Sequence, residues 1–170
     1  MLTHAESHDS PHFHFASIMS PPSEQAQSGS FESSLNGLLH SLLSWQQLAQ
    51  FWPRIDTSAG WFLYAVGEDV PTQPATGEQV ADFIQRVDSL LRRDHREDYC
   101  GIVYADDLES PRFIKIYDPN HLGSSCGSSK TPPLPGWIMS LTAPVELQAK
   151  RIVPGNRKRW WQAFLAGEGA

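Results

Sequence analysis

The stretch of residues 99–142 constrains the fold more than any other part of the chain, because it places several strand patterns close together. Residues 100–105 are rich in β-branched and aromatic side chains, and residues 112–117 alternate between apolar and other side chains. A short acidic turn that ends in proline separates these two segments, which predicts an antiparallel hairpin. Proline and glycine then mark the boundaries of a third predicted strand over residues 137–143.

Two helices and one further strand are predicted ahead of this stretch. Leucines recur at helical spacing over residues 31–50, with Ser30 as the expected cap. Residues 61–66 form a continuous apolar run, which is typical of a strand buried on both faces. Thr76 and Gln79 form a capping-box pattern at the start of the second helix. Its apolar stripe consists of Val80, Phe83, Ile84, Val87, Leu90 and Leu91.

These patterns predict the α+β class. The expected core is β-α-β-β-β, with a single, mostly antiparallel sheet of about four strands, an N-terminal helix and a C-terminal helix. The strand-helix-strand unit would allow residues 61–66 to pair in parallel with residues 100–105 through a right-handed crossover. A length of 170 residues indicates a single domain, which we place at residues 30–170.

The first 29 residues are interpreted as a disordered tail. Ser, Pro, Gln and His dominate this segment without any periodicity, so it cannot bury enough apolar surface to offset its ordering entropy. Its histidines at His4, His8, His12 and His14 could hold a divalent metal loosely. A solvated tail with chance histidines is the simpler interpretation.

Composition and charge exclude several protein classes. The formal net charge of −6 argues against a generic nucleic-acid binder. The cysteine content is too low for a disulfide scaffold or a zinc ribbon. No apolar run approaches the roughly 20 residues that cross a bilayer, and no secretory signal is visible. We therefore expect a cytoplasmic protein with reduced thiols, no membrane contact, no metal and no cofactor.

The loop over residues 118–130 is the candidate ligand or catalytic site, and three interpretations compete. Its backbone N–H groups and a lysine can cradle an anion, although the spacing does not match a P-loop. Alternatively, Cys126 is a nucleophile whose proton passes to His121 or His95. The favoured interpretation is a flexible connector, rich in Gly and Ser because nothing packs against it. The residues predicted to bind an anion are Ser124, Ser125, Gly127, Ser128 and Lys130.

Cys100 is the second cysteine, and it begins a predicted strand. The hairpin register would bring it to the base of the loop that carries Cys126, which makes a disulfide or a redox switch conceivable. We favour the alternative that Cys100 is a small buried hydrophobic residue.

The C-terminal segment combines cations and aromatic residues. Asn156 is the expected cap of a helix whose apolar stripe contains Phe164 and Leu165. Cations in the first turn of a helix oppose its dipole, so they suggest an anionic or acidic partner. The competing interpretation is a solvated cationic turn with both tryptophans packed into the domain. The residues predicted to bind the partner are Arg157, Lys158, Arg159, Trp160 and Trp161.

No motif assembles an evident catalytic constellation, so the sequence favours binding over catalysis. We expect a small cytoplasmic accessory or regulatory protein that binds another protein or an anionic ligand. The alternative is a cysteine-dependent enzyme or redox sensor that uses Cys126.

Overall fold

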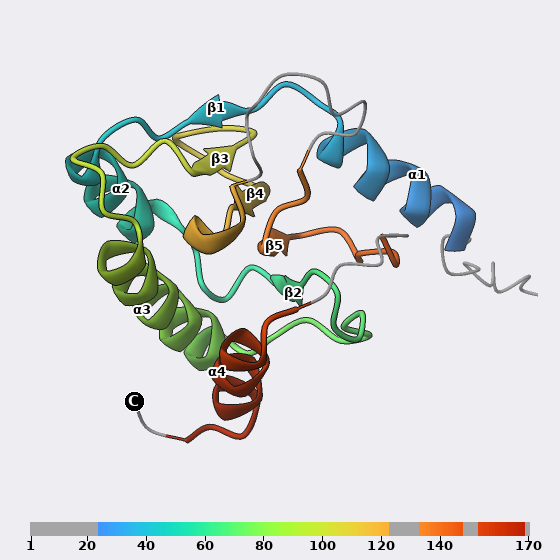
Figure 1. The fold of residues 1–170 in the computed structure, drawn as a ribbon. Helices are drawn as coiled ribbons and strands as arrows, with labels where there is room; N and C mark the ends of the chain where they lie inside the picture. The colour runs from blue at the N-terminus through green and yellow to red at the C-terminus, as the bar shows by residue number, and fades with distance from the viewer. Residues whose placement is uncertain (1–23, 123–132, 148–152, 169–170) are drawn as a thin grey trace, which may run out of the picture.

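A computed structural model of the chain describes residues 24–122, 133–147 and 153–168. Its centre is one five-stranded antiparallel sheet in the order β1-β3-β4-β5-β2 (Figure 1). The strands are β1 (His40–Ser41), β2 (Phe62–Ala65), β3 (Val103–Ala105), β4 (Phe113–Ile116) and β5 (Trp137–Ser140). The predicted α+β class is confirmed, with five strands rather than about four.

The predicted parallel pairing of the segments 61–66 and 100–105 is wrong. β2 pairs with β5, and β3 lies between β1 and β4. The cause is the loop after β2, which doubles back until the Ala75 N–H donates to the Trp61 carbonyl at 2.7 Å. The following helix therefore starts beside the beginning of β2, and the chain leaves it in the direction that makes β3 antiparallel to β2.

The single helix predicted over residues 31–50 is also wrong. The structure has a helix α1 (Glu24–Leu35), the edge strand β1, and a helix α2 (Trp45–Phe51) that is followed by a 3-10 turn, η1 (Trp52–Arg54). Ser44 and Gln47 form a capping box that starts α2 within the predicted helix.

The leucines between the two helices flank the edge strand β1 instead of forming a helical stripe. The Leu42 N–H donates to the Val103 carbonyl at 2.9 Å, which fixes this segment against β3. Leucine spacing alone could not distinguish a helix from this long-range pairing. Because α1 begins at Glu24, its first residues fall within the predicted tail, and residues 1–23 lie outside the described part of the chain.

The hairpin from β3 to β4 is confirmed, and its turn is built by aspartates. Asp106 Oδ1 accepts hydrogen bonds from the backbone N–H groups of Arg112 and Phe113, at 2.9 and 3.0 Å. Asp107 Oδ1 accepts from the N–H groups of Glu109 and Ser110. These carboxylates are turn formers, as their sequence context predicts.

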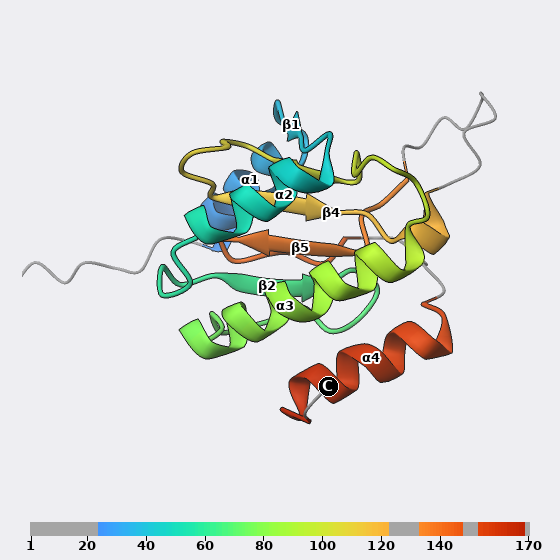
Figure 2. The same ribbon diagram turned by 90° about the vertical axis from the view of Figure 1, so that its left-hand side faces the viewer.

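The sheet separates two apolar layers (Figure 2). The larger layer lies under α2 and the helix α3 (Gly77–Asp94), and the smaller lies under α1. Phe31 of α1 meets Phe113 of β4 edge to face, with ring centroids 5.6 Å apart. None of the described helices combines the length and apolar character needed to cross a membrane.

The prediction for α3 is confirmed in detail. Thr76 and Gln79 form the expected capping box. The buried residues of the helix are Val80, Phe83, Val87, Leu90 and Leu91, and Ile84 is partly buried against the same core. This face of α3 also supports the last helix of the chain, α4 (Gly155–Leu165).

Candidate functional site

An aromatic cluster packs α4 against α3. The Phe83 ring lies edge to face with those of Trp160, Trp161 and Phe164, at centroid distances of 6.3, 6.3 and 5.7 Å. Trp137 of β5 adds a further contact to Trp160 at 5.4 Å. Trp161 is buried and serves the core, whereas Trp160 is only partly buried against it and also lines a surface groove.

The start and the buried face of α4 differ from the prediction. The N-cap is Pro154 rather than Asn156, because the Pro154 carbonyl accepts the N–H groups of Arg157 and Lys158, each at 3.0 Å. Leu165 is 60 % exposed, so it does not belong to the buried stripe. The buried residues of α4 are Arg157, Trp161 and Phe164.

Arg157 is the polar anchor of this helix. Its Nε and one terminal nitrogen donate to the two carboxylate oxygens of Asp118, each at 3.0 Å. The same terminal nitrogen donates to Asp94 Oδ2 at 2.7 Å. Arg157 is 5 % exposed and Asp118 is 2 % exposed. The guanidinium is thus held within the molecule, where a charged group needs such paired contacts.

Asp94 lies at the end of α3 and joins two arginines. Its carboxylate accepts from Arg93 at 2.7 Å as well as from Arg157. The hydrogen bond from Arg93, supported by Arg157, lowers the pKa of Asp94 from 3.8 to about 2 despite partial burial. This network therefore holds the end of α3 and the start of α4 together.

The sequence analysis missed both aspartates of the network. Asp118 follows β4 and also caps a 3-10 turn, η2 (Pro119–His121), by accepting the Asn120 N–H. A usable signal lay on α4, because Arg157, Trp161 and Phe164 follow helical spacing. An arginine in line with a buried stripe requires an acidic partner inside the fold.

A small polar space adjoins this network. It measures about 20 Å³ and is lined in part by Glu68, Asp118 and Arg157. Glu68 Oε1 is shielded from solvent and has no hydrogen-bond partner within the described residues. The space can hold about one water molecule and is too small for a substrate.

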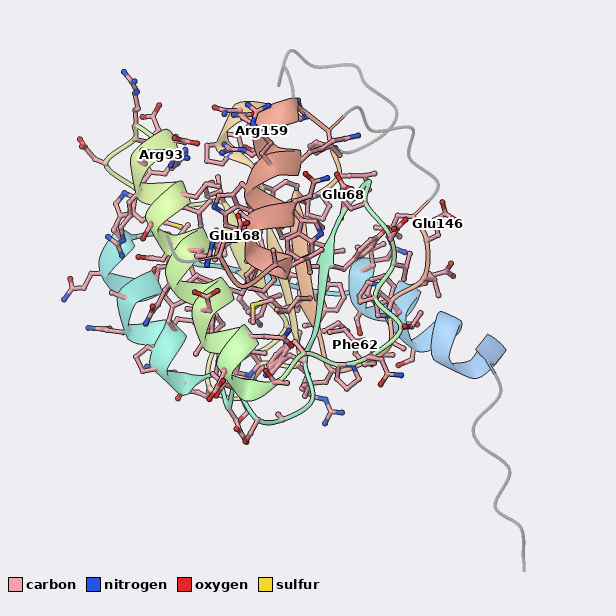
Figure 3. All side chains as sticks on the ribbon, turned by 90° about the horizontal axis from the view of Figure 1, so that it is seen from below. Phe62, Glu68, Arg93, Glu146, Arg159 and Glu168 are labelled. Atoms are coloured by element: carbon pink, nitrogen blue, oxygen red, sulfur yellow. The ribbon has the colours of Figure 1, made fainter. Side chains whose placement is uncertain are left out.

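A larger groove runs between α3 and α4, and Figure 3 shows the two helices side by side. We call it the α3/α4 groove; it measures about 400 Å³. Its floor is apolar, from Leu90, Trp160 and Ala163. The polar wall consists of Asp82, Gln85, Arg86, Ser89 and Arg93.

Two exposed cations, Lys158 and Arg159, lie near the start of α4, and neither lines the α3/α4 groove itself. Neither has an ion-pair partner in the part of the chain that the structure describes. Arg159 precedes Ala163 by four residues, so both lie on the same side of the helix. Figure 3 shows Arg159 and Arg93 at the same end of the two helices. The arginines of the polar wall differ from these two unpaired cations, because Arg86 pairs with Asp82 and Arg93 pairs with Asp94.

A second hollow, at the ends of α2 and α3, carries no such charge excess. It measures about 360 Å³ and is lined by Trp45, Arg92, His95, Arg96 and Glu97. Arg92 lies over the Trp45 ring and pairs with Asp88, and the Trp45 indole donates to the Glu97 carbonyl. The side chains of Arg96 and Glu97 have no ion-pair partner among the described residues, but they carry opposite charges, so the hollow has no net excess of unpaired charge.

The residues of the predicted loop site are only partly described. Ser124, Ser125, Cys126, Gly127, Ser128 and Lys130 lie outside the described residues. His121 is exposed, with Nδ1 4.0 Å from an Asp118 oxygen. His95, the other proposed base, is buried with Nε2 2.9 Å from the Cys100 carbonyl. Use of Cys126 as a nucleophile stays a prediction.

Cys100 is fully buried, which confirms its interpretation as a small hydrophobic residue. Burial raises the pKa of its thiol, so the reactive thiolate is disfavoured.

Comparison with known proteins yields no match: no family model, no curated protein and no solved structure resembles the chain. The fold and the site define an α+β protein with an amphipathic groove beside its last helix.

Proposed function

We propose that this chain is a cytoplasmic accessory protein that binds an acidic segment of another protein in the α3/α4 groove. The observation that carries the proposal is an apolar floor with Arg159, a cation that no described acid neutralises, on the same side of α4. Tryptophan and arginine dominate the energetics of protein interfaces, and Trp160 and Arg159 supply both.

The position of these cations supports a role outside the fold. Lys158 and Arg159 are the fourth and fifth residues of α4, close to the helix end at which the dipole places partial positive charge. Arg157, their neighbour, is neutralised by two aspartates. The protein as a whole carries a net charge of −6, so this local positive patch would orient an acidic partner toward the groove.

The chemistry of the groove specifies the occupant. A partner segment should place one apolar side chain on the floor beside Trp160 and Ala163. Its carboxylates should reach Arg159, and Lys158 adds positive charge at the same end of α4. Nucleic acid would meet the same cations, but it would not use the apolar floor, and the two classes differ in their response to a blocked floor.

The test uses a synthetic peptide of Glu and Asp residues around a single Leu, titrated into the full chain while tryptophan fluorescence is recorded. Ala163→Glu places a negative charge on the groove floor and should weaken binding at least tenfold. Gln162→Glu is the matched control, because it adds the same charge at the adjacent, exposed position. Replacing the Leu of the peptide by Ser should also weaken binding.

Equal affinity of the Ala163→Glu and Gln162→Glu variants would contradict the proposal. Binding that depends on the acids of the peptide but not on its Leu would favour a purely electrostatic site of the kind that takes nucleic acid.

A further inference from the structure

The sheet face opposite α3 and α4 carries a row of side chains that crosses all five strands. Each member lies directly opposite the next in the strand register. From edge to edge the row contains Ser41, Tyr104, Lys115, Ile138 and Tyr64. The neighbours of Lys115 along β4, Ile114 and Ile116, belong to the core on the other face. Lys115 therefore lies on the α1 side of the sheet.

The two ends of this row are covered differently. Ile138 and Tyr64 are 0 % and 2 % exposed and pack in the smaller apolar layer with Phe31 of α1. At the other end, Tyr104 and Lys115 are only half-buried. The open end of the row is therefore the part that a ligand can reach.

Lys115 lies between two tyrosines at this open end. Tyr104 is directly opposite it on β3, and Tyr117 follows the end of β4, two residues further along the chain, where it also borders the larger apolar layer. The two tyrosine rings meet edge to face, with centroids 5.6 Å apart. Three polar groups, one ammonium and two hydroxyls, thus gather on a single patch of the sheet.

These three polar groups reach solvent, and none is paired within the described part of the chain. Neither the Lys115 ammonium nor the hydroxyl of Tyr104 or Tyr117 has a hydrogen-bond or ion-pair partner there. Burial alone lowers the pKa of Lys115, and burial raises the pKa of Tyr117. A cation partly withdrawn from water without a counter-charge is unfavourable, and an anion placed beside it would relieve that cost.

We propose that Lys115, Tyr104 and Tyr117 form a binding site for an oxyanion, the carboxylate or phosphate group of a small molecule. Lys115 supplies the counter-charge, and the two hydroxyls donate hydrogen bonds to the oxygens. A neutral apolar ligand would leave all three groups unsatisfied, and a cation would be repelled. Lys115 and Tyr104 lie on the other face of the sheet from the α3/α4 groove, so this oxyanion site does not depend on the function of the groove.

The test measures acylation of lysines in the full chain near neutral pH with an amine-reactive ester, followed by peptide mass mapping. Inorganic phosphate is one arm and acetate the other, each titrated at constant ionic strength with chloride. We expect a saturable, several-fold fall in the labelling rate of Lys115 in at least one arm. The amino group of Met1 and Lys150 serve as internal controls, whose rates should not change, because neither belongs to this site or to the α3/α4 groove.

The two arms identify the ligand chemistry. Stronger protection by phosphate assigns the site to phosphorylated ligands, and stronger protection by acetate assigns it to carboxylates. A Lys115 rate that neither anion changes, or that changes in parallel with the control rates, would overturn the proposal.

Tyrosine variants test the geometry of the site. Tyr104→Phe and Tyr117→Phe each remove one hydroxyl and keep the ring, so each should raise the half-protecting anion concentration several-fold. Tyr99→Phe is the matched control, because Tyr99 is 57 % exposed and lies elsewhere. Protection of Lys115 that is unchanged in both variants would overturn the three-residue site.

Discussion

Arg157 and Lys115 are both cations withdrawn from water, on opposite faces of the same sheet, yet their surroundings differ. Arg157 is 5 % exposed, and two aspartates take its donors. Lys115 is half-buried, and no acid of the described chain pairs with it. A cation that serves the fold is accompanied by its counter-charges. A cation without one is available to a ligand.

Lys158 and Arg159 show a third arrangement, in which solvent rather than a counter-charge stabilises the cations. They follow Arg157 directly in the sequence, but their side chains are exposed and have no described ion-pair partner. Three adjacent cations thus divide into one that anchors α4 and two that face outward. Substituting each kind should therefore affect stability to very different extents.

Arg157→Gln should have the largest effect on stability. It leaves the carboxylates of Asp118 and Asp94 without their shared partner, which typically costs about 3–5 kcal/mol for a buried pair. Urea unfolding measures the loss, with Lys158→Gln as the matched control. A loss below about 1 kcal/mol would show that Arg157 does not anchor α4 and would remove the contrast with Lys115.

The second largest effect should be a loss of stability in acid, caused by protonation of Asp94. Its pKa is lowered to about 2 in the folded chain, mainly by Arg93 and then Arg157, from an ordinary value of 3.8. Its contribution to stability is therefore present above pH 3.8 and is lost as the pH falls toward 2. Urea midpoints recorded across this window should fall less steeply in Asp94→Asn than in the native chain. Identical slopes would place the acid sensitivity elsewhere.

Lys115→Met should change stability in the opposite direction from Arg157→Gln. It keeps an unbranched side chain and removes a half-buried charge that has no described counter-ion, so we expect a gain of about 1 kcal/mol. Thermal unfolding in an anion-poor buffer measures it. Destabilisation would mean that the ammonium has a structural role, and the comparison with Arg157 would then fail.

Lys158→Gln and Arg159→Gln together should have the smallest effect on the fold. Removing charge near the start of α4 relieves repulsion with the helix dipole, worth a few tenths of a kcal/mol. The melting temperature should stay level or rise slightly. A marked fall would assign these cations to the fold alongside Arg157.

Local chemistry made the middle of the chain predictable. The capping box at Thr76, the apolar stripe of α3 and the aspartate-built hairpin turn all involve residues close in sequence. Each was predicted correctly because its contacts lie within a turn or two of the chain.

Long-range contacts explain what the sequence could not show. The edge strand β1 pairs with β3, and the next residue, Leu42, donates its N–H to the Val103 carbonyl; no local pattern records these partners. Arg157 likewise meets acids 39 and 63 residues away, so its role in the fold was hidden among exposed cations. The groove and the oxyanion site are both formed by residues from separate segments of the sequence.

We propose that Lys158 and Arg159 serve binding rather than folding. The most direct measurement is the association rate of the acidic peptide at low and moderate salt, for the native chain and the Lys158→Gln/Arg159→Gln double variant. The account predicts slower association and a weaker salt dependence in the variant, with an unchanged melting temperature. Equal rates and equal salt dependence in the two proteins would contradict it.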